Sequence, residues 1–218
     1  MLKYNKKIEY PNKARENDMH LDIQRALKVD KELRIKYMVH TPRMSGRIGI
    51  PLFMVLFLAY ILIFSMFHTI SFIAIELLPR KYSLIFKIMS MLNPFFLIIG
   101  FLSLGSLTRP KALLLLYDNQ RPPSFAQTLK LLPLYSRFLL FTPIAIFVLL
   151  YSLITGHKRY YFFHLAPFYI IDQNMNPITA IKKTYYLIPD DQLEHLFGMG
   201  EFGYADLYRQ MHPYKGSN

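Results

Sequence analysis

The chain has 218 residues, with 26 Lys and Arg against 14 Asp and Glu, and its formal net charge is +12. Hydrophobic residues make up 53% of the chain, and it contains no Cys and no Trp. The missing cysteines exclude disulfides, thiolate-ligated zinc or iron–sulfur centres and a cysteine nucleophile. A mean hydropathy of +0.21 with a pI near 9.7 is unusual for a soluble domain and typical of a small membrane protein with basic flanks.

The first part of the chain, residues 1–48, is polar and basic. It is too long and too charged for a secretory signal, and its acidic residues are not typical of a cleavable transit peptide. Residues 21–38 carry apolar side chains between Lys and acidic residues. This pattern predicts a helix that lies on a membrane surface or on a partner protein. A solvated helix with scattered apolar contacts is the alternative.

Three long stretches with hardly any formal charge follow, of 28, 21 and 19 residues. A helix needs about 20 apolar residues to cross the hydrocarbon core of a bilayer. None of the stretches shows the alternation with charge that an amphipathic soluble helix would have. The sequence therefore predicts an all-α integral membrane protein with polar helical extensions at both ends. The predicted transmembrane helices lie near 50–77, 84–108 and 132–155.

An aromatic segment, residues 160–171, ends the predicted membrane domain of residues 49–171. It contains Pro167 and is short for a span, so an interfacial or re-entrant piece is favoured over a short fourth span. The polar C-terminal tail, residues 172–218, is too short to build a core of its own. Pro177 preceded by an Asn predicts a short helix within it.

The orientation follows from the basic residues around the three predicted spans. The N-terminal segment and the loop after the second span share one side and hold 16 Lys and Arg, whereas the other side holds 5 before the tail. The positive-inside rule then places the N-terminus in the cytoplasm or the mitochondrial matrix. The tail is nearly neutral and does not determine its own side.

No motif of the common catalytic, nucleotide-binding or metal-binding sites is present, so no catalytic residue, cofactor or metal is predicted. Ionisable residues at membrane depth are nevertheless functional candidates. Three such residues stand out. His68 is expected to be a packing or hydrogen-bonded residue, with a lipid or partner contact and a proton relay as the alternatives. Glu76 is expected to pair with nearby bases, and Arg137 is expected to reach toward the headgroups.

The basic residues at the ends of the spans form a more coherent set, and such residues attract anionic headgroups. We predict that they hold at least one anionic phospholipid such as cardiolipin; the alternative is a plain topology signal with an aromatic belt. Nucleic-acid binding is not predicted, because much of the positive charge lies at the ends of the predicted spans and does not form one soluble basic face. The predicted lipid-binding residues are Arg43, Arg47, Arg80, Lys81, Arg109, Lys111, Lys158 and Arg159.

These features favour a non-catalytic, accessory transmembrane subunit of a large membrane complex, with other membrane subunits and anionic lipids as partners. Few spans, an over-long first span and polar extensions at both ends support this. Abundant Lys, Tyr, Phe and Ile suggest a respiratory-chain or ATP-synthase assembly of the mitochondrial inner membrane, with the N-terminus in the matrix. A bacterial plasma membrane is the alternative location, and a small oligomeric transporter or channel is the alternative function. A lipid-acting enzyme would need a clustered acid/base or metal set that the sequence does not show.

Overall fold

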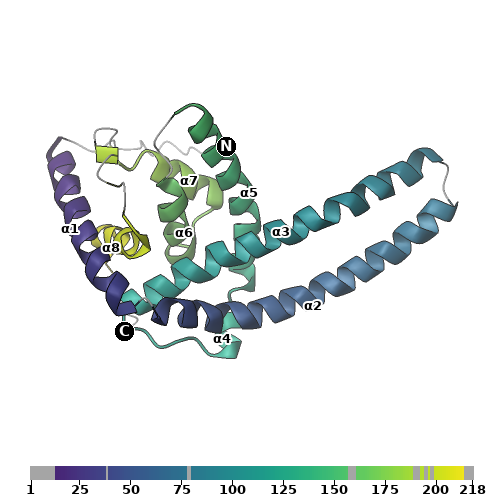
Figure 1. Ribbon diagram of the computed structural model, residues 1–218, viewed down its shortest axis with the longest axis horizontal. Coiled ribbons are helices and arrows are strands. Elements are labelled where there is room, and N and C mark those ends of the chain that lie inside the picture. The colour runs from purple at the N-terminus through teal and green to yellow at the C-terminus, as the bar shows by residue number, and fades with distance from the viewer. Residues whose placement is uncertain are drawn as a thin grey trace, which may run out of the picture.

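The computed structural model describes residues 13–37, 39–77, 80–156, 161–188, 192–193, 196 and 199–213. Within these residues the secondary structure is helical and no strand is present, which confirms the predicted all-α class (Figure 1). The helices are α1 (Lys13–Tyr37), α2 (His40–Leu77), α3 (Arg80–Tyr117), α4 (Phe125–Leu129), α5 (Leu132–Ile154), α6 (Phe162–Asp172), α7 (Pro177–Tyr185) and α8 (Glu201–Met211).

The largest feature is an antiparallel hairpin of α2 and α3, which projects away from the remaining helices (Figure 1). Each helix has 38 residues, or about 57 Å at 1.5 Å per residue. The rings of Phe53 and Phe101 stack between the two helices with centroids 5.5 Å apart. Near the base of the hairpin, Ser45 donates a hydrogen bond to Thr108 over 3.2 Å.

Both hairpin helices extend further than the spans predicted near 50–77 and 84–108. The second continues nine residues past 108 because its last turns enter the folded part of the chain, where Ala112, Leu113 and Leu114 are buried. The remaining helices, α1 and α4–α8, form this folded part, which we call the body. The hairpin is therefore anchored in the body at its base and free of it toward its tip.

The aromatic segment forms α6 in the middle of the body. Leu165, Tyr169 and Ile170 are fully buried, and α6 packs against α3, α5, α7 and α8. Hydropathy alone suggested an interfacial piece or a short fourth span at residues 160–171. The structure shows another reason for its apolar composition, because protein covers most of its side chains.

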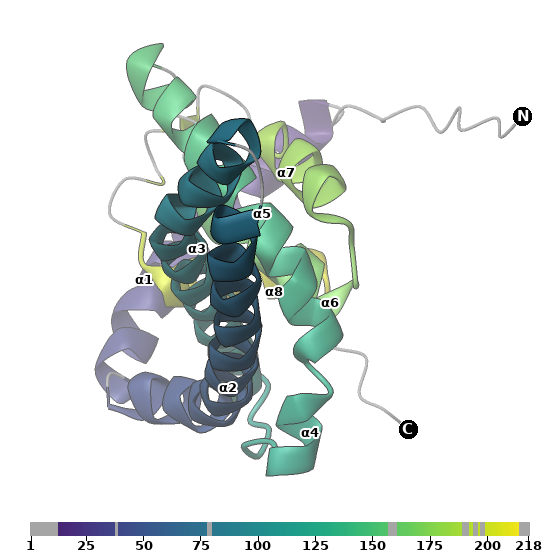
Figure 2. The ribbon, with the colours of Figure 1, turned by 90° about the vertical axis from the view of Figure 1, so that its right-hand side faces the viewer.

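The helix α5 crosses the hairpin at a steep angle instead of running parallel to it. In Figure 1 it runs from the bottom of the view toward the top, whereas the hairpin runs across the view. In Figure 2 the hairpin tip faces the viewer and α5 runs obliquely beside the hairpin. Two polar contacts mark the crossing. Tyr135 donates to the carbonyl oxygen of Gly100 over 3.1 Å, and Ser103 donates to Thr142 over 3.0 Å.

Three helices in the described residues are long and apolar enough to cross a membrane: His40–Ala74, Pro94–Tyr117 and Leu132–Ile154. Their number matches the sequence prediction and the third coincides with the span predicted near 132–155, whereas the second lies about ten residues later than the one predicted near 84–108. The three helices suggest a membrane protein. They differ in how much of each the protein covers. Only 6% of the most apolar window of the first is buried, against 33% and 28% for the others.

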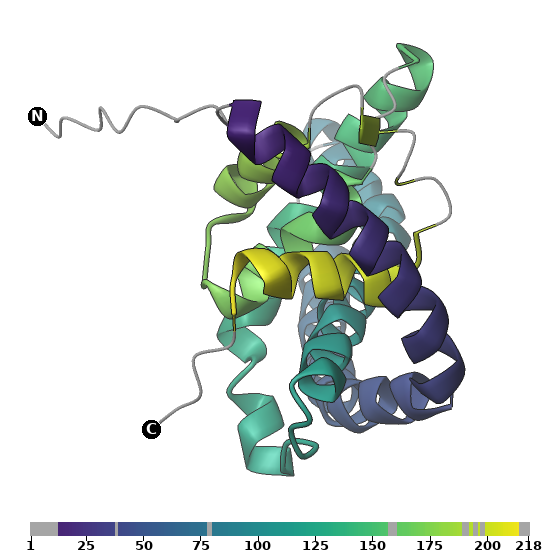
Figure 3. The same ribbon diagram turned by 90° about the vertical axis from the view of Figure 1, so that its left-hand side faces the viewer.

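The C-terminal segment is integrated into the body. As predicted, α7 begins at Pro177, and the Asn176 side chain caps it by accepting from the Ile178 N–H over 3.0 Å. The last helix, α8, lies against α1 (Figure 3) and is almost entirely buried. The described residues of the predicted polar tail, 172–218, therefore supply side chains to the core of the body.

Candidate functional site

The outer part of the hairpin presents an apolar surface that no other part of the described chain covers. We call residues 54–77 of α2 and 80–100 of α3 the distal hairpin. Large exposed apolar surfaces mark contact with a membrane or with another protein. The large hydrophobic side chains of the distal hairpin that are more than half exposed are Met54, Leu58, Leu62, Ile63, Met66, Ile70, Phe72, Leu77, Leu84, Met91, Phe95, Phe96 and Ile98.

Ionisable residues on the distal hairpin are few. His68 is exposed and stacks on Phe64 with ring centroids 4.9 Å apart, so it packs on its own helix. Glu76 is exposed near the tip. Arg80 and Lys81 begin α3 beside it, but their side chains lie outside the described part of the structure. The pairing predicted for Glu76 therefore stays a prediction.

Basic residues also lie at the base of the hairpin. Arg43 and Arg47 are exposed one turn apart on α2. Arg109 forms an ion pair with Glu201 of α8, with 2.6 Å between Nε and Oε2, and Lys111 is half-buried two residues further on. Burial raises the pKa of the Glu201 carboxyl, and the neighbouring Arg109 opposes that rise.

The eight predicted lipid-binding residues do not form one pocket. Arg80 lies 29 residues from Arg109 along α3, or about 44 Å at 1.5 Å per residue. Lys158 and Arg159 lie outside the described residues. The structure instead separates the described members into a group at the tip and a group at the base.

Arg137 has partners within the protein. Its guanidinium donates to the backbone carbonyl oxygens of Asn174 and Met175, the latter over 3.4 Å. These bonds tie the first turns of α5 to the connection before α7. The side chain was expected to reach toward the headgroups, and it serves in the structure as a link between helices.

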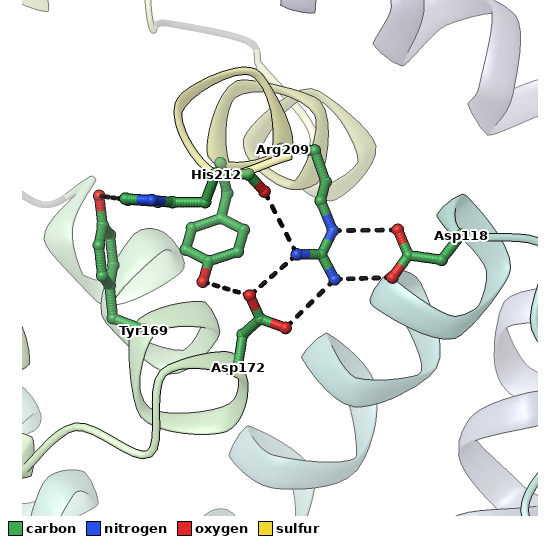
Figure 4. Close-up of polar contacts among 6 residues, drawn as sticks. Asp118, Tyr169, Asp172, Arg209 and His212 are labelled. Carbon is green, nitrogen blue, oxygen red and sulfur yellow. Dashed lines mark hydrogen bonds and ion pairs between the residues drawn. The ribbon is translucent and has the colours of Figure 1, made fainter. Parts of the chain in front are cut away.

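Sequence reasoning missed a buried polar network that holds α8 in place (Figure 4). The Arg209 guanidinium donates to both oxygens of Asp118, over 3.0 and 2.6 Å, and to Asp172 over 2.9 Å. Tyr208 donates to Asp172 over 2.8 Å. The ring of His212 lies 3.2 Å from the Tyr169 hydroxyl. The network thus joins the end of α3, the end of α6 and α8.

The single guanidinium of this network faces two carboxylates, and Lys111 is a second cation near them. The side chains of Arg209 and Asp118 are only 6% and 5% exposed. Burial alone would lower the pKa of Arg209, but the two carboxylates overcome that effect and raise it above its usual value. Such a buried pair is specific in its geometry, and removing one partner leaves an uncompensated charge.

A second buried carboxylate, that of Asp30, holds the other end of α8. It accepts from the backbone N–H of Gly200 over 3.1 Å and of Gly203 over 2.9 Å, and Arg34 lies 3.4 Å from it. A carboxylate at a helix N-terminus satisfies free amides and interacts favourably with the helix dipole. Because Asp30 belongs to α1, this contact docks α1 onto α8.

A cleft of about 460 Å³ opens beside the network, where α1, α3 and α8 meet, and its lining includes Asp22, Arg25 and Arg209. Its Arg209 and Asp118 side chains are already paired with each other. In the described residues no group of three or more His, Asp or Glu side chains is placed to hold a metal ion. No family model, curated protein or solved structure matches the chain. Function is therefore inferred from the geometry of this chain alone.

Proposed function

We propose that the chain is a non-catalytic, structural subunit of a membrane-embedded protein complex, anchored through the α2–α3 hairpin. The observation that carries this proposal is the exposure of the first candidate span, of which only 6% of the most apolar window is buried. A surface this apolar needs lipid or protein around it. The polar body at the base of the hairpin then provides the surface for neighbouring subunits outside the hydrocarbon core.

The charges along the hairpin support a position across the bilayer. On α2, no Lys, Arg, Asp or Glu lies between Arg47 and Glu76, and on α3 none lies between Lys87 and Arg109. These intervals correspond to about 43 and 33 Å of helix. The hydrocarbon core is about 30 Å thick, so the charged residues at both ends can reach the headgroup layers.

A hairpin that crosses the bilayer in this way would bring Arg43 and Arg47, at its base, close to phospholipid headgroups. Arg43 and Arg47 are exposed and would lie at the headgroup level, where each basic residue contributes about 1 kcal/mol of attraction to anionic lipid. We propose that this pair contacts phospholipid headgroups such as those of cardiolipin. Arg109 contributes less, because Glu201 already neutralises it.

As the finer assignment we propose a respiratory-chain or ATP-synthase complex of the mitochondrial inner membrane, with the N-terminus in the matrix. The composition supports it through abundant Lys, 16 Tyr and 18 Phe without Cys or Trp, and the basic N-terminal segment supports the orientation. A transporter or channel would need a polar path. The exposed surface of the distal hairpin is apolar, so the accessory subunit is the better supported function.

The test is extraction of native membranes in mild detergent, followed by native gel electrophoresis and mass spectrometry of the band that contains the chain. We expect co-migration with a large energy-converting complex. Truncating the outer surface by Leu62→Ala, Ile63→Ala and Met66→Ala together should reduce that co-migration. Ile35→Ala, at an even more exposed apolar site on α1, is the control. Migration of the wild-type chain alone or as a small homo-oligomer would overturn the proposal.

A further inference from the structure

We infer that the chain crosses the membrane twice, through the hairpin alone, and that α5 lies along the bilayer surface on the side of the body. The inference rests on the membrane location proposed above and differs from the three crossings that hydropathy predicts. Both polar ends of the described chain then lie on one side. The apolar side of α5 becomes a second membrane-contacting surface.

The first argument is the contact between the two ends of the chain. The helix α1 precedes every candidate span and α8 follows every one, yet the Asp30 carboxylate of α1 accepts from the amides of Gly200 and Gly203. Groups in hydrogen-bond contact lie on the same side of a bilayer. The number of crossings between α1 and α8 must therefore be even.

The second argument places the two crossings. Arg209 of α8 binds Asp118, just after α3, and Glu201 of α8 binds Arg109 of α3. The end of α3 is thus on the same side as α8, and the hairpin supplies two crossings before it. Between Asp118 and α8, α5 could cross only if a later segment returned.

No described segment can make that return. The helix α6 has 11 residues, or about 16 Å of length, which is about half of the hydrocarbon thickness. Most of its side chains are also buried in the body. The helix α7 has 9 residues. Among the described helices after α3, α5 is therefore the only one long enough to cross, and the contacts of α8 forbid it.

The lengths agree with two crossings. The crossing point of α5 on α3 is at Gly100, where Tyr135 binds. From there to the start of α3, residues 80–100 span about 32 Å, and residues 54–77 of α2 span about 36 Å. Both lengths suffice for a hydrocarbon core of about 30 Å, and Lys87 is close enough to the tip for its long side chain to extend toward the headgroup layer there. The helix α5 then lies where the hairpin leaves the bilayer.

The side chains of α5 fit a helix that lies in the interface. Phe138, Phe141 and Ala145 are fully buried, on a helix that packs against α3, α6 and α7. The opposite side exposes large apolar residues, and a helix in the interface buries such a side about 5–10 Å into the headgroup and acyl boundary. Its exposed members are Leu139, Leu140, Phe147, Leu150, Tyr151, Leu153 and Ile154. We assign the bilayer as the partner of this surface because it is continuous with the emerging hairpin.

The charge distribution agrees with this topology. Only three of the 26 Lys and Arg residues, Arg80, Lys81 and Lys87, lie between residues 50 and 108. With two crossings all the other basic residues share the side of the body. The positive-inside rule then places the body and both ends in the cytoplasm or matrix and the hairpin tip on the opposite side.

The absence of native cysteine makes a direct topology test possible. Single variants Leu21→Cys, Leu77→Cys, Thr155→Cys and Lys182→Cys place one thiol each on α1, at the hairpin tip, after α5 and on α7, all at exposed positions. Sealed vesicles of known orientation are treated with a membrane-impermeant maleimide, and labelling after detergent addition gives the full signal. We expect Leu77→Cys to be labelled from one side and the other three from the opposite side.

The other outcomes are distinct. If the variants at positions 77, 155 and 182 are labelled from one side and the variant at position 21 from the other, the chain crosses three times. The inference then fails, but the proposed membrane role stands. If Thr155→Cys is labelled from the same side as Leu77→Cys, and Lys182→Cys from the same side as Leu21→Cys, then α5 crosses the membrane and a later segment returns. That result also overturns the inference. Labelling of all four from one side removes the crossing by the hairpin, and release of the chain by alkaline carbonate would remove the proposed function as well.

The position of α5 can be measured separately, because the chain has no Trp. Phe147→Trp and Met66→Trp each introduce a single fluorophore at an exposed site of α5 and of the distal hairpin. Lipids brominated at different depths then quench each indole according to its depth. We expect shallow bromines to quench Phe147→Trp best and deep bromines to quench Met66→Trp best. Equal deep quenching of both would show that α5 spans the membrane.

Discussion

Removing the positive charge from the buried network should undock α8. In Arg209→Met the carboxylates of Asp118 and Asp172 lose their cation, although the substituted side chain keeps most of its apolar stem. Breaking a buried pair from one side costs about 3–5 kcal/mol. The Asp172 side chain is 30% exposed, so solvent screens its charge. The lower end of that range therefore applies. We therefore expect the opening of α8 to become easier by about 3 kcal/mol.

Hydrogen–deuterium exchange of peptides covering residues 201–211, in detergent or in nanodiscs, measures this opening directly. A change of about 3 kcal/mol corresponds to a loss of about two orders of magnitude in protection. The control is Arg209→Met combined with Asp118→Asn, Asp172→Asn and Lys111→Met, which removes both carboxylates and the neighbouring cation and should recover much of the protection. If Arg209→Met exchanged at the wild-type rate, the network would not hold α8, and the reasoning from charge burial would be refuted.

Four further sets of substitutions extend these tests. Burial lowers the pKa of His212 below its usual value of 6.5, so His212 takes up a proton when α8 undocks at a pH below 6.5. The protection of α8 against exchange should therefore be full above pH 6.5 and should decline as the pH falls below it. His212→Gln should weaken this decline. An alanine Cβ at Gly203 would lie 3.2 Å from a backbone oxygen of α1, so Gly203→Ala should destabilise by about 1–3 kcal/mol in thermal unfolding. Gly105→Ala, with nothing within 4 Å, should be neutral or stabilising by up to about 1 kcal/mol. Arg43→Gln with Arg47→Gln should lower the affinity of the detergent-purified chain for anionic phospholipid about tenfold to thirtyfold at about 1 kcal/mol per residue, whereas Lys at both positions should retain it.

The features that sequence predicted are those that depend on local chemistry. The long apolar runs produced α2, α3 and α5, because the length and composition of a run need no knowledge of its partners. The start of α7 followed from an Asn cap and Pro177, which act within one helical turn. The ends of α2 and α3 were less predictable, since packing of Ala112 and its neighbours against the body decides where α3 stops.

The features that sequence did not predict depend on partners far along the chain. Arg209 lies 91 residues from Asp118 and 37 from Asp172, and no motif links such positions. Hydropathy also does not distinguish lipid from protein as the surroundings of an apolar helix. The aromatic run of α6 is apolar because the body encloses it, whereas α2 is apolar and uncovered.

The direction of α5 shows how polar contacts can decide what hydropathy leaves open. By composition α5 is as good a span as the helices of the hairpin, and counting spans from the sequence gives three. The polar contacts that hold α8 to α1 and to the end of α3 are hydrogen bonds and ion pairs of about 3 Å, a distance that cannot bridge a hydrocarbon layer of about 30 Å. These contacts involve charged groups, which lose several kcal/mol when separated from their partners in a buried setting. A third crossing would have to break all of them, and two crossings break none.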